Sequence, residues 1–218
     1  MVGSSKSSAP HVEQTVTTAS GFVALAIGLV LLVAGGYTLW QAVLSGPRLG
    51  SVLLGVGMLI FGVLALAAMY TLQPNEAAIL QLFGAYRGTT RVAGLRATNP
   101  FYSRRRISLR ARNLNGDRLK VNDKRGNPIE IAAVVVWHVE DTAKAAFDVD
   151  DYENFVKVQS EAAVRHLASS FAYDAGEAGS PSEPTLLESA DVVARSLVRE
   201  LQARLDQAGV VVDESRLS

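Results

Sequence analysis

Two long uncharged apolar runs constrain the fold of this 218-residue chain more than any other feature. Gly21 to Trp40 reads GFVALAIGLVLLVAGGYTLW, and Val52 to Tyr70 reads VLLGVGMLIFGVLALAAMY. At a rise of ~1.5 Å per residue, each run would form a helix about 28–30 Å long, which matches the hydrocarbon thickness of a bilayer. Pro47 and Arg48 separate the runs. The pattern therefore predicts a transmembrane hairpin over residues 21–70, with spans at 21–40 and 52–70.

Two other interpretations of these runs remain open. A pair of buried core helices would usually show a polar stripe, and neither run has one. A signal peptide has an apolar core of only ~7–15 residues and a basic start, whereas the residues before Gly21 carry a single Lys and a second apolar run follows. Met1 to Ser20 is rich in Ser, Thr and small residues, and we expect it to be a disordered tail.

The net charge of zero is a cancellation between blocks of opposite sign. Residues 1–70 sum to +1, residues 71–125 to +9 and residues 126–218 to −10. Two spans place both termini on the same side, and the positive-inside rule puts the Arg-rich segment that follows them in the cytoplasm. We therefore expect an integral membrane protein whose termini are both cytoplasmic.

After Pro74 the hydrophobic period changes to that of an α+β domain. Short strands are predicted at 76–83, 86–92, 95–98, 106–109 and 119–122, and a central strand at 129–140. Asp141 and Asp151 are predicted N-caps of helices at 142–147 and 152–170. A loop at 172–184 precedes a last helix with an apolar stripe, which ends near Gly209 before a strand at 210–212.

The chain shows little that points to catalysis or metal binding. It contains no Cys, which excludes disulfides and thiolate ligands, and no GxSxG, P-loop, GxGxxG or HExxH motif. His138 has only Glu140 nearby on its strand, which is a weak metal signal. Asp148 to Glu153 holds four carboxylates, but helix capping explains them better than a Ca²⁺ loop. We expect no catalytic residue, no metal and no cofactor.

Arginines form the strongest charge cluster. Three interpretations compete: a nucleic-acid patch, which lacks interleaved aromatics; a contact with lipid headgroups or a neighbouring subunit; and a solvated strand edge. We favour the lipid or subunit contact and expect no nucleic-acid partner. The cluster consists of Arg104, Arg105, Arg106, Arg110 and Arg112.

The chain from Gln73 onward resembles the stomatin/prohibitin/flotillin/HflK-C superfamily, whose shared unit is called the SPFH, band 7 or PHB domain. The resemblance rests on QPNEAAILQLFGAYRGT (73–89), GLRATNPF (94–101) and LKVNDKRGNPIEIAAVVVWHVEDTAKAAFDVDDYENFV (119–156). Ala93-Gly94-Leu95 stands where many members have Pro-Gly-Leu. The expected architecture is thus a two-helix transmembrane hairpin followed by an SPFH domain with an antiparallel-rich sheet and packed helices.

This resemblance implies a non-enzymatic scaffold in a bacterial-type inner or plasma membrane. Such a protein self-associates on the bilayer, organises membrane microdomains, and regulates or encloses partners such as a membrane protease or a channel. Anionic lipid headgroups are a further expected partner. The alternatives are a monomeric membrane-anchored binding module and, with less support, an accessory subunit of a membrane hydrolase.

The expected domain ranges follow from these arguments. Residues 1–20 are the tail, 21–70 the hairpin and 71–213 the SPFH domain. Relatives of this kind continue into a long helical region, so residues 214–218 are expected to begin a truncated helix.

Overall fold

The computed structural model describes residues 12–46, 48–174, 186 and 190–217, and it divides into two compact units. One unit comprises residues 14–108, and the other comprises residues 109–218 together with the first thirteen residues. The expected domain at 71–213 therefore extends over parts of both units. The division falls between Ser108 and Leu109 rather than at the end of the second apolar run.

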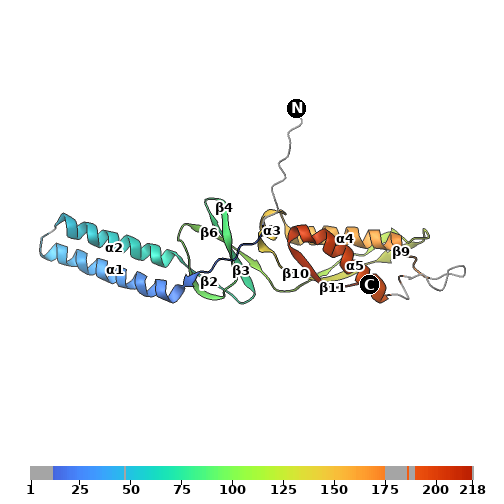
Figure 1. Ribbon diagram of the computed structural model, residues 1–218, viewed down its shortest axis with the longest axis horizontal. Coiled ribbons are helices and arrows are strands. Elements are labelled where there is room, and N and C mark those ends of the chain that lie inside the picture. The colour runs from blue at the N-terminus through green and yellow to red at the C-terminus, as the bar shows by residue number, and fades with distance from the viewer. Residues whose placement is uncertain (1–11, 47, 175–185, 187–189, 218) are drawn as a thin grey trace, which may run out of the picture. The chain divides into compact units, whose positions relative to one another are not determined.

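The first unit contains an antiparallel pair of helices, α1 (Gly21–Leu44) and α2 (Leu49–Ala67) (Figure 1). Both are long and apolar enough to cross a membrane, and only 11% of each apolar window is buried. Core helices of a soluble protein would be mostly covered, so the low burial favours membrane spans. Helix α2 ends before the predicted limit at Tyr70, because the next strand, β2 (Met69–Leu72), has already begun there.

Glycines spaced by seven residues form the contact between the two helices. Gly28 and Gly35 on α1 meet Gly62 and Gly55 on α2. A Cβ atom added at Gly35 would lie 2.9 Å from the carbonyl oxygen of Gly55, and one at Gly62 would lie 3.1 Å from that of Gly28. The seven-residue period keeps small residues on one seam, as in a left-handed helix pair, although no two of these glycines have GxxxG spacing.

The first unit also contains two three-stranded antiparallel sheets. Their strand orders are β1-β5-β2 and β4-β3-β6. Strand β1 comes just before α1 in the sequence, and strand β2 comes just after α2. Ser20 of β1 and Tyr70 of β2 nevertheless both pair with Arg96 of β5. Both ends of the hairpin are thus joined to one strand. The strands of this unit are β1 (Ala19–Ser20), β2, β3 (Glu76–Leu82), β4 (Ala85–Thr90), β5 (Gly94–Ala97) and β6 (Tyr102–Ser108).

The prediction of a disordered tail at 1–20 is wrong for the residues just before α1, which are extended and hydrogen-bonded within the first unit. The Val16 N–H donates to the Thr89 carbonyl oxygen at 2.9 Å, and the Thr89 N–H donates to that of Gln14 at 2.7 Å. Gly88 permits this close approach, because its φ is 141° and an added Cβ would lie 2.8 Å from the Gln14 oxygen. The β-branched residues at 15–18 favour the extended backbone that the pairing needs. Residues 1–11 lie outside the described part of the chain.

The second unit places helices against a three-stranded sheet of order β11-β10-β7, with a separate ribbon of β8 and β9 (Figure 1). Helix α5 packs on β11 and on α4, and α4 also contacts β8 and β10. Buried Val and Leu side chains of α4, α5, β10 and β11 form its core. The elements are β7 (Arg112–Asn115), β8 (Leu119–Asn122), β9 (Pro128–Ile131), β10 (Ala133–Val139), α3 (Thr142–Phe147), α4 (Tyr152–Ser170), α5 (Ala190–Leu205), the 3-10 helix η1 (Asp206–Ala208) and β11 (Val210–Leu217).

Local signals for the helix ends are confirmed in this unit. The Asp141 carboxylate accepts hydrogen bonds from the N–H groups of residues 143 and 144, and Asp151 accepts from those of residues 153 and 154. Helices α3 and α4 begin directly after these caps, as predicted. Gly209 adopts a left-handed conformation with φ 65°, also as predicted for the residue that ends the last helix.

Two expectations for this unit need correction. The predicted strand at 129–140 is interrupted at Ala132, because β9 pairs with β8 whereas β10 pairs with β7 and β11. Residues 214–217 belong to β11 and pair with β10, so they do not start a helix. Most of the loop predicted at 172–184 lies outside the described residues.

The glycine seam yields a stability prediction with a neighbouring control. Gly35→Leu should destabilise the hairpin by about 1–3 kcal/mol, because the side chain meets the α2 backbone and forces the helices apart. Gly36→Leu adds the same side chain where nothing lies within 4 Å, so its stability should change little. Thermal unfolding in mild detergent compares the two variants. Equal stabilities would contradict the close contact between the helices at Gly35.

Candidate functional site

The five arginines predicted as one contact site belong to different units. Arg104, Arg105 and Arg106 lie on β6 in the first unit, whereas Arg110 and Arg112 fall in the second. The predicted cluster is therefore at least two local environments.

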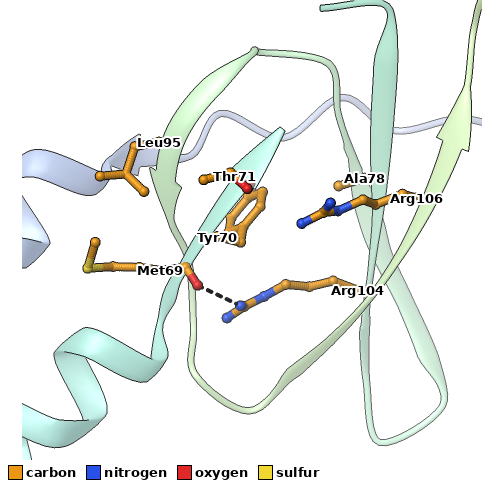
Figure 2. A pocket seen from close by; sticks show the side chains of 7 residues that line it. All are labelled: Met69, Tyr70, Thr71, Ala78, Leu95, Arg104 and Arg106. Atoms are coloured by element: carbon orange, nitrogen blue, oxygen red, sulfur yellow. Dashed lines mark hydrogen bonds between the residues drawn. The ribbon is translucent and has the colours of Figure 1, made fainter. Parts of the chain in front are cut away.

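Arg104 holds the carboxyl end of helix α2. Its Nη1 donates to the carbonyl oxygen of Met69 at 3.1 Å, and its Nη2 donates to those of Ala67 and Ala68 at 3.3 and 3.2 Å. The guanidinium carbon also lies 5.0 Å from the centre of the Tyr70 ring, in a cation–π contact. Figure 2 shows Arg104 reaching from its strand towards Met69 and Tyr70.

These contacts satisfy groups that an α-helix cannot satisfy by itself. The last carbonyls of a helix have no partner within the helix, and the helix dipole makes this end partly negative. A cation that donates several hydrogen bonds both bonds these carbonyls and offsets the partial negative charge. Burial lowers the pKa of the Arg104 guanidinium below its usual value, and the nearby Tyr70 partly offsets this effect. An arginine nevertheless remains charged at neutral pH.

The alternation of the strand separates the three consecutive arginines of β6. Arg104 pairs with Leu80 of β3 and Arg106 with Ala78, so both lie on one face of the sheet. Arg105 pairs with Ile79 and projects from the opposite face. Only alternate members of the run can therefore act together.

Arg104 and Arg106 line a cavity of about 460 Å³ at the end of α2 (Figure 2). Met69 and Leu95 contribute apolar walls, and Tyr70 contributes its ring. Figure 2 shows both arginine side chains extending from β6 towards that ring. The cavity thus combines two cationic groups with an apolar surface beside the last turn of an apolar helix.

Arg112 performs a different task in the second unit. Its guanidinium forms an ion pair with Glu153 and lies 5.7 Å from the Trp137 ring centre and 5.9 Å from that of Tyr152. The two rings meet edge to face with centres 6.1 Å apart. Arg112 therefore joins β7 to β10 and to the start of α4.

The other sequence candidates have structural explanations. His138 Nδ1 lies 2.9 Å from a carboxylate oxygen of Asp213 on the neighbouring strand. Among the crowded carboxylates at 148–153, Asp151 is a helix cap. Across the described ranges, no group of three or more His, Cys, Asp or Glu residues could hold a metal ion.

The bond between Arg104 and the helix end could not be predicted from the sequence. The partners lie 35–37 residues apart, so no local pattern connects them. The alternation of strand side chains could have predicted part of the site, because it places Arg105 on the opposite face from Arg104 and Arg106.

Comparison with known proteins agrees with this architecture of an apolar hairpin followed by a sheet-rich domain with packed helices. The model of the SPFH domain / Band 7 family matches residues 70–218, and the chain belongs to this family. Protein HflC of Treponema pallidum (strain Nichols) is 29% identical over 99 residues, which make up 45% of this chain and 30% of that protein. The matched stretch thus spans less than a third of that relative. Together these findings indicate a membrane-associated scaffold or regulator.

The helix-end contact predicts a large difference between two arginines on the same face. Arg104→Gln should destabilise the junction by about 2–3 kcal/mol, because charge-assisted hydrogen bonds to three carbonyls are lost. Arg106→Gln should have little effect on stability, since its side chain is exposed. Hydrogen exchange at the last turn of α2 measures this difference. Faster exchange in both variants, or in neither, would contradict the assigned role of Arg104.

Proposed function

We propose that this chain is a subunit of an oligomeric scaffold that organises membrane microdomains and regulates or encloses a membrane protein, such as a protease or a channel. It has no catalytic activity of its own in this proposal. The main support for this proposal is that an apolar hairpin leads directly into a sheet domain of the SPFH / Band 7 family. Arg104 joins the two by bonding to the carbonyl oxygens at the end of the hairpin. A junction of this kind would hold the adjoining sheets at the membrane surface.

The charge of the first unit supports a position against an anionic membrane. Residues 14–108 carry seven Arg, no Lys and one carboxylate, that of Glu76, for a net charge of +6. Each basic group near an anionic leaflet contributes roughly 1 kcal/mol of attraction. The cytoplasmic leaflet is the anionic one, which favours a cytoplasmic location for the termini and for the domain.

Self-association has electrostatic support as well. The remaining residues, 1–13 and 109–218, carry a net charge of −6, opposite to that of the first unit. Opposite charges on two units of one chain allow a head-to-tail contact between neighbouring copies, and such contacts form a ring when the rotation from one copy to the next closes. Arg105 and Arg110 are exposed and belong to opposite units, so we propose them as further lipid or subunit contacts.

The absence of catalysis is proposed from the described polar side chains. The two histidines that the structure describes both face carboxylates, His138 facing Asp213 and His166 facing Glu200. The first pair bridges neighbouring strands, and the second joins α4 to α5. Pairing between elements is the ordinary structural role of such groups.

The size of the complex tests the proposal directly. In mild detergent, light scattering should report a protein mass many times that of the 23.2 kDa chain. Crosslinking in native membranes should give a ladder of bands at multiples of the mass of one chain. A monomer by both measurements would overturn the scaffold and favour an anchored binding module.

Orientation is tested by labelling with a membrane-impermeant maleimide, which the absence of native Cys makes simple. Ser45 follows α1 at the hairpin turn and Ser169 lies near the end of α4, and both are exposed. In intact cells Ser45→Cys should be labelled and Ser169→Cys should not. After lysis both should react, which controls for accessibility. The reverse pattern would place the domain outside the cytoplasm.

A further inference from the structure

The cavity beside Arg104 has the chemistry of a site for an anion that also has an apolar part. Two guanidinium groups face it, and none of the residues that line it carries a carboxylate. Its volume of about 460 Å³ lies within the range of small-ligand pockets. Met69 and Leu95 give the same cavity an apolar side.

Two buried polar atoms at this site have no partner within the described part of the chain. They are the Tyr70 hydroxyl and Arg104 Nε. Tyr70 is only 8% exposed, so its hydroxyl is largely shielded from bulk water. Buried polar groups are nearly always hydrogen-bonded, and both of these atoms are donors. Both atoms belong to side chains that line the cavity, so an oxygen-rich anion bound there would be the nearest acceptor available to them.

We propose that this cavity binds the phosphate group of an anionic membrane lipid. Arginine is well suited to phosphate, because its planar guanidinium can donate two parallel hydrogen bonds. The carbonyl contacts already fix the position of Arg104, and the exposed Arg106 supplies a second cation from the same face. The Tyr70 hydroxyl provides a neutral donor.

The surroundings favour a lipid over free phosphate as the source of this group. The cavity lies beside the end of α2, where an apolar helix would leave the bilayer. The glycerol and first methylene groups of a lipid would lie against Met69 and Leu95, whereas inorganic phosphate would leave these walls without a partner. This inference rests on the proposed membrane anchoring, but not on self-association.

The test uses the full chain in dodecyl maltoside micelles and native mass spectrometry. Dioleoylphosphatidylglycerol is titrated in, with dioleoylphosphatidylcholine and inorganic phosphate as separate comparators. The wild-type chain should retain phosphatidylglycerol at least several-fold more strongly than phosphatidylcholine. Arg106→Gln should weaken this binding about tenfold, the usual effect of losing a charge-assisted hydrogen bond.

Two further variants sharpen the result. Tyr70→Phe removes only the unpartnered hydroxyl and should weaken binding several-fold without unfolding the site. Arg87→Gln changes the same charge at an exposed position of β4 that does not line the cavity, so binding should be unchanged. An equal loss in the Arg87 and Arg106 variants would mean unspecific attraction and would overturn the site.

The remaining outcomes are decisive as well. If inorganic phosphate binds as tightly as phosphatidylglycerol and depends equally on Arg106, the lipid is the wrong source. If no variant changes lipid retention, the cavity is not the binding site. The same spectra report how many chains associate, so loss of the lipid site and failure of the scaffold proposal are separate observations.

Discussion

The carboxyl end of an apolar helix presents several carbonyl oxygens that the helix itself cannot bond, and the junction in this protein depends on how they are satisfied. Arg104 donates to the carbonyl oxygens of residues 67, 68 and 69, which places a cation from β6 against α2 and the start of β2. Strand β2 pairs with β5, and β5 also pairs with β1. One side chain therefore connects the hairpin to both sheets of its unit.

Much of the fold follows from local sequence signals. The length of the apolar runs predicts the hairpin, and the side chains of Asp141 and Asp151 predict where α3 and α4 begin, because capping involves residues only two or three positions apart. Residues 12–20 show that amino-acid composition alone can wrongly predict disorder. Their Ser and Thr content suggests disorder, but their extended backbone is stabilised by bonds to Thr89, more than seventy residues away in sequence. The partners of Arg104 were hidden for the same reason.

The division of the chain also changes the meaning of its charge. A division at the end of the apolar runs gives a nearly neutral block followed by strongly basic and acidic ones. The compact units instead give +6 for residues 14–108 and −6 for the remainder. The hairpin thus shares a unit with arginines and a single carboxylate. A unit of this composition attracts an anionic leaflet with little internal neutralisation of its charge.

The electrostatics of the helix end explain why two arginines are needed there. The carboxyl end of a helix carries about half a negative elementary charge, so it repels a phosphate rather than attracting it. Arg104 offsets this repulsion through the bonds of Nη1 and Nη2 to the last carbonyls, which leaves only its Nε as a donor for another anion. A second cation on the same face is required before a phosphate can be held, and Arg106 supplies it because strand residues two apart project together. The intervening Arg105 cannot take this role. Identical neighbours in the sequence therefore differ in function because of the strand period alone.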